Sequence, residues 1–165
     1  YERARRDRLT GTLNRSGLEE IWLREVEQAK TGATDLSIGI LDVDNFKALN
    51  DTHGHQVGDE ALIHLASIIR NALHGTDTLA RYGGEEFVVV LPDTDEKGAE
   101  AVMTRLQREL TKHFFLHGNE RLLITFSAGV TKVQIERDTL ISAVERADKA
   151  LYKAKNAGKN RVVAG

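Results

Sequence analysis

Thr78-Leu-Ala-Arg-Tyr-Gly-Gly-Glu-Glu-Phe-Val-Val-Val-Leu-Pro92 is the stretch of this sequence that decides the fold. Two apolar runs, over about 78–82 and 86–91, flank the glycine pair Gly83-Gly84, and glycines between such runs are typical of a β-hairpin. Pro92 closes the second strand. The sequence therefore predicts an antiparallel hairpin that carries Glu85 and Glu86 at its turn.

Helical and strand patterns alternate on both sides of this hairpin. Upstream we expect a helix over about 16–30 capped by Asn14, a buried strand over 36–41, a short helix over 45–51 and an amphipathic helix over 57–73. Downstream we expect a helix over 95–113, a strand over 121–131, a helix over 139–157 ended by Gly158, and a short strand over 161–164. This order predicts an α+β fold with a ferredoxin-like βαββαβ core, in which helices flank a central mixed sheet.

Composition narrows the class of protein. The 165 residues fit one domain, and a net charge of −2 gives no reason to expect nucleic-acid binding. The absence of cysteine excludes disulfides and thiolate zinc sites and suits a cytoplasmic domain. Because the chain begins at Tyr1 without a signal-peptide pattern, we interpret residues 1–8 as the end of an upstream linker helix and residues 9–165 as the domain proper. Whether the full-length protein carries a membrane anchor further upstream stays an open question at this point.

Two acidic clusters follow or join predicted strands. Asp42 and Asp44 come directly after the buried strand, and Glu85 and Glu86 lie at the hairpin turn. Neighbouring strands would bring both clusters to one edge of the sheet, where unbalanced carboxylates repel one another and a divalent cation relieves the repulsion. The alternative is that the aspartates are turn residues and the glutamates are solvated charges.

Further polar residues are candidates for binding a guanine base and phosphate groups beside such a cation. Asn50 and Asp59 flank a glycine turn, so both can face one ligand, and an aspartate can accept hydrogen bonds from the ring N–H and exocyclic amine of guanine. Helix capping is the structural alternative for this pair. Lys47 is a phosphate candidate beside the predicted metal, whereas Lys155 and Lys159 are also explained by the dipole of the last helix.

Four segments, in order, resemble the GGDEF family over nearly the whole chain. They are Asp7-Arg-Leu-Thr-Gly-Thr-Leu-Asn-Arg15; Asp42-Val-Asp-Asn-Phe-Lys-Ala-Leu-Asn-Asp51 with Gly54-His-Gln-Val-Gly-Asp59; Arg81-Tyr-Gly-Gly-Glu-Glu-Phe87; and Ala147-Asp-Lys-Ala-Leu-Tyr-Lys-Ala-Lys155 through Asn160-Arg-Val162. The third segment is similar to the GGEEF variant found in active members. The resemblance implies a fold similar to the nucleotidyl cyclase and polymerase palm.

The resemblance also implies an activity: diguanylate cyclases condense two GTP into cyclic di-GMP and two pyrophosphates. By this analogy two Mg²⁺ ions, or Mn²⁺, bind each active site, and two domains meet as a homodimer with one GTP each. An upstream sensory domain in the full-length chain would control that meeting. The implied roles are metal binding by Asp42, the Val43 carbonyl, Glu85 and Glu86; catalysis by Glu85 and Glu86; guanine binding by Asn50 and Asp59; and phosphate binding by Asn45, Phe46, Lys47, Lys155 and Lys159.

One departure from the family pattern concerns product inhibition. Many members carry Arg-x-x-Asp upstream of the hairpin, whereas this chain has His74-Gly-Thr-Asp77. Histidine lacks the guanidinium fork, so we expect feedback inhibition through His74 and Asp77 to be weak or absent. Two other functions stay open: a silent receptor for GTP or cyclic di-GMP, and a structural dimerisation module.

Overall fold

The computed structural model describes residues 4–165. Its helices are α1 (Arg15–Gly32), α2 (Phe46–His53), α3 (His55–Ala72), α4 (Glu96–Thr111) and α5 (Leu140–Asn156). Its strands are β1 (Leu36–Val43), β2 (Thr78–Arg81), β3 (Glu86–Pro92), β4 (Phe115–His117), β5 (Glu120–Leu122), β6 (Phe126–Lys132) and β7 (Val162–Ala164).

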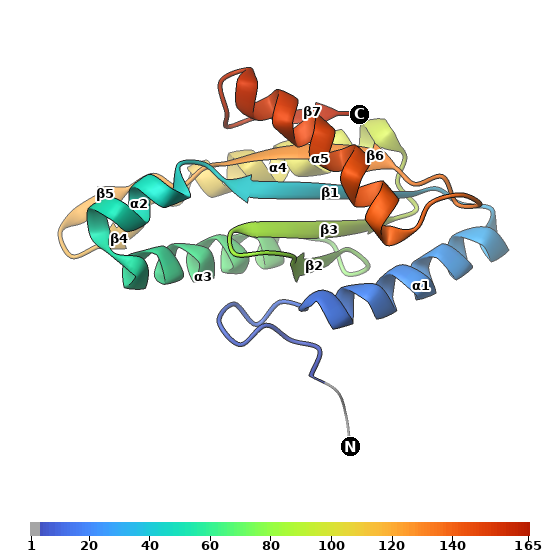
Figure 1. Ribbon diagram of the computed structural model, residues 1–165, viewed down its shortest axis with the longest axis horizontal. Helices are drawn as coiled ribbons and strands as arrows, with labels where there is room; N and C mark the ends of the chain where they lie inside the picture. Colours follow the sequence, from blue (N-terminus) through green and yellow to red (C-terminus); the bar gives the residue numbers. More distant parts are fainter. Residues whose placement is uncertain (1–3) are drawn as a thin grey trace.

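Five of the strands form one sheet in the order β2-β3-β1-β6-β7 (Figure 1). β1 is antiparallel to both β3 and β6, and the predicted hairpin pairs β2 with β3. The strand order of β2, β3, β1 and β6, connected through α3 and α4, is that of a ferredoxin-like core. β7 adds a parallel strand beside β6, so the sheet is mixed and the predicted fold class is confirmed.

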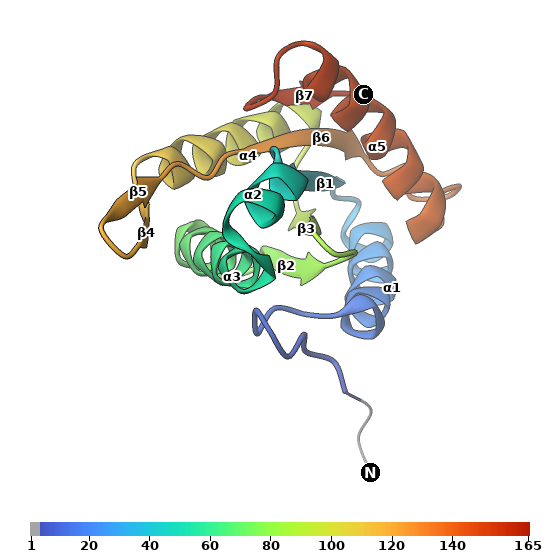
Figure 2. The same ribbon diagram turned by 60° about the vertical axis from the view of Figure 1, so that its left-hand side comes forward.

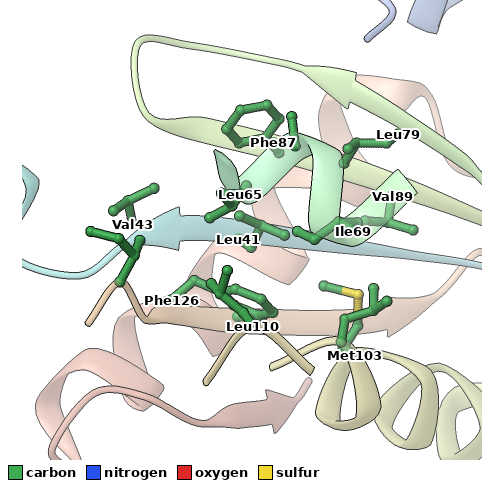
Figure 3. Packing of buried hydrophobic residues seen from close by; sticks show 14 of the residues in the cluster. Leu41, Val43, Leu65, Ile69, Leu79, Phe87, Val89, Met103, Leu110 and Phe126 are labelled. Carbon is green, nitrogen blue, oxygen red and sulfur yellow. The ribbon is translucent and has the colours of Figure 1, made fainter. Parts of the chain in front are cut away.

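Alternation along β1 produces one apolar layer on each face of the sheet, because successive side chains of a strand point to opposite faces. Leu41 and Val43 join the cluster under α3 and α4, which Figure 3 shows with Phe87, Phe126 and Met103. Ile38 and Ile40 join the second cluster, with residues of α1 and α5. Figure 2 shows α3 and α4 on one side of the strands and α1 and α5 on the other. Every residue of β1 is buried, as a central strand requires.

Helix α5 lies directly on β6 at Gly129. A Cβ atom on Gly129 would fall 2.1 Å from the carbonyl oxygen of Ala147 and 2.4 Å from the backbone nitrogen of Leu151. Because those atoms belong to the backbone of α5, the helix would have to move away from the sheet. Gly129 therefore sets the position of α5, and with it the position of Lys155 near the end of that helix.

Replacing Gly129 with alanine should lower the free energy of unfolding by about 3 kcal/mol or more, since a rigid contact cannot relax. Gly39→Ala is the matched control, because the three atoms nearest to a Cβ at Gly39 all belong to the flexible Met103 side chain, at 3.0–3.1 Å. We expect the control to cost about 1 kcal/mol or less. Urea denaturation of both variants measures the difference, and equal costs would contradict the contact between Gly129 and α5.

Two predicted elements differ from the structure. The single strand expected over 121–131 is divided, because the chain forms the β4–β5 hairpin and then turns into β6. The hydrogen bond from the Asp44 amide to the Thr125 carbonyl, 2.9 Å, holds the chain at this break. The helix expected at the N-terminus is not seen in residues 4–8, where Arg6 pairs with Leu13 in an isolated bridge; residues 1–3 lie outside the described residues. None of the helices between residues 4 and 165 combines the length and apolar character needed to cross a membrane.

Candidate active site

A cleft of about 460 Å³ opens at the carboxyl end of β1, where the chain turns into α2. Figure 1 shows α2 leaving this end of β1 and the last turn of α5 approaching the same region. The residues that line the cleft are Asp42, Val43, Asp44, Asn45, Phe46, Lys47, Ala48, Asp51, Glu85, Lys155 and Lys159. The structure thus brings together most of the residues predicted to bind metal and phosphate.

Asp42 is the most buried acid of this cleft, with 8% of its surface exposed. It lies in phase with Ile38 and Ile40, so its side chain faces α5, and Glu86 is its register partner on β3. Lys155 donates a hydrogen bond of 2.5 Å to Asp42 Oδ2, whereas Oδ1 is buried without a hydrogen-bond partner among the described residues. Burial raises the pKa of Asp42 above its ordinary value, although the hydrogen bond from Lys155 opposes the shift.

Arg81 holds the turn that carries Glu85 and Glu86. Its guanidinium donates to the Gly84 carbonyl through Nε (3.1 Å) and Nη2 (2.7 Å), and through Nη1 it pairs with the carboxylate of Asp7. Burial, followed by the charge of Asp42, raises the pKa values of both glutamates. The hairpin therefore presents carboxylates whose mutual repulsion a cation would relieve.

The oxygen donors of the cleft are those that a hard divalent cation prefers. Among residues 4–165, no group of three or more carboxylates or imidazoles is arranged to hold a metal ion. Mg²⁺ is usually held by one or two carboxylates together with substrate phosphates, so a set as small as Asp42 and Glu85 is compatible with such an ion. The orphaned Oδ1 of Asp42 is a buried acceptor of the kind such an ion needs. The residues fit the ion, and the predicted ligands Asp42, Val43, Glu85 and Glu86 stay predictions.

The N-terminus of α2 also lines the cleft. Asn45 precedes the helix with a left-handed φ of 57° and makes no side-chain capping bond, so the first amides of α2 keep their hydrogen-bonding capacity. Free amides at a helix N-terminus favour phosphate. Lys159 Nζ donates to Asn45 Oδ1 (2.7 Å), and Lys47 pairs with Asp51 (3.0 Å) in an exposed ion pair at the rim.

Asp44 has a structural role at the edge of the cleft. Its carboxylate accepts hydrogen bonds from the Thr125 hydroxyl (2.7 Å), the Ser127 hydroxyl (2.6 Å) and the backbone amide of Asn160 (3.0 Å). Asp42 and Asp44 do emerge together at this edge of the sheet, as expected, since both line the cleft, but the carboxylate of Asp44 is already occupied by these three donors. Its carboxylate fixes the segment that carries Lys159.

Asn50 and Asp59 lie at the junction of α2 and α3, outside the residues that line the cleft. A Cβ on Gly58 would fall 1.8 Å from Asn50 Oδ1, so the Asn50 amide lies against the backbone next to Asp59. Asn50 Oδ1 is buried and has no hydrogen-bond partner among the described residues, and Asp59 is exposed. The pair is available to a ligand rather than used in capping.

His74 and Asp77 are not part of the cleft. They line a separate cavity of about 390 Å³ together with Arg6 and Arg70. The Asp77 amide donates to the His74 carbonyl (3.0 Å), which closes a tight turn before β2. Burial raises the pKa of the Asp77 carboxyl, and hydrogen bonding of that carboxyl to the backbone of His74 partly offsets the shift.

Two residues near the site are absent from the sequence-based prediction. Asp148 lies two helical turns before Lys155 on α5, and its charge acts on Asp42, Glu86 and Lys155. The spacing of seven residues, which places two side chains on one helix face, was the available signal. Arg15 donates to the Tyr82 carbonyl (2.7 Å) and lies over the Tyr82 ring, 4.0 Å from its centroid. This contact depends on the tertiary fold and has no local signal.

The family described as "Diguanylate cyclase, GGDEF domain" matches residues 4–161. The chain belongs to the GGDEF family. Diguanylate cyclase A of Treponema denticola is 42% identical over 77% of this chain and 34% of its own length. Diguanylate cyclase DgcP of Pseudomonas aeruginosa is 40% identical over 98% of this chain and 24% of its own length. This GGDEF chain thus spans about a third or less of these relatives.

Solved structures agree with this assignment. The diguanylate cyclase SiaD of Pseudomonas aeruginosa, solved with its activator SiaC, has a TM-score of 0.92 and 38% identity, covering 97% of this chain and 61% of that one. The GGDEF domain of DgcB from Caulobacter crescentus, solved with cyclic di-GMP, has a TM-score of 0.91 and 34% identity. The match covers 99% of this chain and 94% of that one. The architecture described above is that of GGDEF domains.

Proposed function

We propose that this GGDEF domain is a diguanylate cyclase that condenses two GTP into cyclic di-GMP and two pyrophosphates. The observation that carries the proposal is the cleft at the end of β1, where Asp42 and Glu85 face Lys155 and the N-terminus of α2. Carboxylates for a cation beside cationic groups and free amides for phosphates are what a nucleoside triphosphate requires. The named relatives supply the reaction class.

Each residue has a role in this proposal. Asp42 and Glu85 hold a divalent cation, with Val43 and Glu86 contributing to the same site, and Asn50 and Asp59 bind guanine. Asn45, Phe46, Lys47, Lys155 and Lys159 bind the triphosphate. When bound, Mg²⁺ or Mn²⁺, two per site, would neutralise phosphate charge and lower the pKa of the attacking hydroxyl. Glu85, whose pKa burial raises, accepts the proton of that hydroxyl.

The product requires a second copy of the domain. Each chain carries one pair of guanine-binding residues, Asn50 and Asp59, whereas cyclic di-GMP contains two guanines. In each of two equivalent steps, the 3′-hydroxyl of one GTP attacks the α-phosphorus of the other. A phosphodiester bond forms, the α–β anhydride bond breaks, and pyrophosphate leaves with the electron pair. A homodimer in which two clefts face each other meets this requirement, and an upstream sensory domain would control it.

We further propose that product inhibition through His74 and Asp77 is weak or absent. His74 is exposed and offers one ring edge where a guanidinium would offer a fork of donors. Cyclic di-GMP added during turnover should leave the initial rate unchanged up to high micromolar concentrations. Inhibition at low micromolar product that disappears in Asp77→Ala would show the opposite.

The direct test of the activity is incubation of the protein with GTP and Mg²⁺, followed by chromatographic separation of nucleotides. Formation of cyclic di-GMP supports the proposal. Tight GTP binding without any product at high protein concentration would indicate a silent receptor instead.

A further inference from the structure

The carboxylate of Asp42 already carries a cationic partner from the chain itself. Lys155 Nζ lies 2.5 Å from Asp42 Oδ2, and the side chains of Asp42 and Lys155 are 12% and 38% exposed. Lys155 donates the one hydrogen bond that reaches this carboxylate from the side chains of residues 4–165. The ammonium and a divalent cation therefore require the same acid.

The two cations cannot share Asp42 without cost. A cation bound at Oδ2 would have to take the position of the ammonium, and a cation bound at Oδ1 would lie beside a positive charge. Like charges at such separations repel strongly where water is largely excluded. Binding of a cation at Asp42 thus weakens the hold of Asp42 on Lys155.

Lys155 is able to leave Asp42. Its side chain is long and partly exposed, and it lies near the C-terminal end of α5. A phosphate acceptor would lie within the same cleft, because Lys155, Lys159, Asn45 and Phe46 all line it. Lys159, in the segment that follows α5, donates a hydrogen bond to Asn45, which precedes α2, so the N-terminus of α2 lies beside the segment into which α5 leads.

We propose that Lys155 is an internal counter-ion of Asp42 that is displaced when a divalent cation binds, and that its freed ammonium then pairs with the triphosphate of GTP. This inference rests on the proposed function, because it assigns the nucleotide as the second partner of Lys155. Its consequence is positive coupling: nucleotide captures the displaced lysine, so cation and GTP each raise the affinity for the other.

Binding of Mn²⁺ without nucleotide, followed by electron paramagnetic resonance of the free ion, tests the displacement. Lys155→Gln should bind Mn²⁺ roughly fivefold or more tightly than the wild type, on the scale of a partly buried ion pair. A GTP analogue with an α,β-methylene bridge should then raise Mn²⁺ affinity by a smaller factor in Lys155→Gln than in the wild type. Circular dichroism establishes that each variant is folded.

Lys159→Gln is the matched control, since it removes one positive charge from the same lysine-rich segment. In the wild type Lys159 pairs with the neutral amide of Asn45 and not with a carboxylate. Its Mn²⁺ affinity without nucleotide should stay within about twofold of the wild type. Lys155→Arg, which keeps the charge, should also stay close to the wild type and provides a second variant should Lys155→Gln fail to fold.

Equal or weaker Mn²⁺ binding by Lys155→Gln overturns the proposal, as does an equal gain in Lys159→Gln or a gain in Lys155→Arg. Absence of Mn²⁺ binding in all variants overturns it as well. The outcome is separate from that of the proposed function. A wild type that makes cyclic di-GMP while Lys155→Gln shows no gain keeps the function and removes the counter-ion role. A gain in Mn²⁺ affinity in Lys155→Gln, when the wild type makes no cyclic di-GMP, keeps the counter-ion role and removes the proposed function.

Discussion

Replacing Asp42 with asparagine abolishes the conversion of GTP into cyclic di-GMP, with turnover falling by about a thousandfold or more. Asparagine keeps the shape of the side chain and one acceptor, but it removes the charge that a divalent cation needs. Because burial raises the pKa of Asp42, the charged form is disfavoured by folding, and its loss does not weaken the fold. We expect the unfolding free energy to stay within about 1 kcal/mol of the wild type, because the ammonium of Lys155 is partly exposed and can return to water when its partner loses the charge.

Asp44→Asn is the matched control for this prediction. Asp44 follows Asp42 by two residues, but three hydrogen bonds from Thr125, Ser127 and Asn160 occupy its carboxylate. This variant should lose about 1–3 kcal/mol of stability while keeping its Mn²⁺ affinity within about threefold. Urea denaturation and Mn²⁺ binding separate the two aspartates. Loss of Mn²⁺ binding in Asp44→Asn, with retention in Asp42→Asn, would reverse the assignment of the cation ligand.

Replacing Gly58 with alanine lowers kcat/KM for GTP by about 10- to 100-fold without touching the cleft. The new methyl group would fall 1.8 Å from Asn50 Oδ1, so the Asn50 side chain has to leave its position beside Asp59. The predicted size corresponds to the loss of one buried polar contact, about 1–3 kcal/mol. Steady-state kinetics with GTP, with thermal unfolding as a check on the fold, measures this effect.

A double-mutant cycle shows whether the effect of Gly58→Ala acts through Asn50. In Asn50→Ala the main clash at position 58 is removed and only Phe46 Cζ, at 3.2 Å, stays close, so adding Gly58→Ala should cause little further loss. Strongly non-additive effects are therefore expected. Additive losses, or a Gly58→Ala variant within twofold of the wild type, would contradict the assignment of Asn50 to guanine.

Local patterns were sufficient to predict most of the fold. Three features were decisive, and the structure contains the element that each predicts. The buried run 36–41 is β1, the glycine pair 83–84 is the turn between β2 and β3, and the apolar stripe over 57–73 is α3. The β4–β5 hairpin was missed although Gly118, with a φ of 60°, and Asn119 form its turn, because the apolar run Leu122-Leu123-Ile124 reads as one strand.

The site could not be predicted from the sequence where the hydrogen-bond partners of its side chains lie far apart along the chain. Asp42 and Glu85 could be placed together because neighbouring strands carry them. The partners of Asp44 lie 81 to 116 residues away along the chain, and that of Asp42 lies 113 residues away. Asp42 keeps one oxygen without a partner, whereas both oxygens of Asp44 accept hydrogen bonds. This difference depends on how α5 and the segment before β7 cross the sheet, and no local pattern encodes that crossing.

The most direct test of the central claim is the rate of cyclic di-GMP formation from GTP and Mg²⁺, measured across a wide range of protein concentrations. If two copies each contribute one GTP, cyclic di-GMP and pyrophosphate appear in a ratio of one to two, and the rate per chain rises with protein concentration. GTP that remains intact at every protein concentration, in a folded protein that binds it, would contradict the claim.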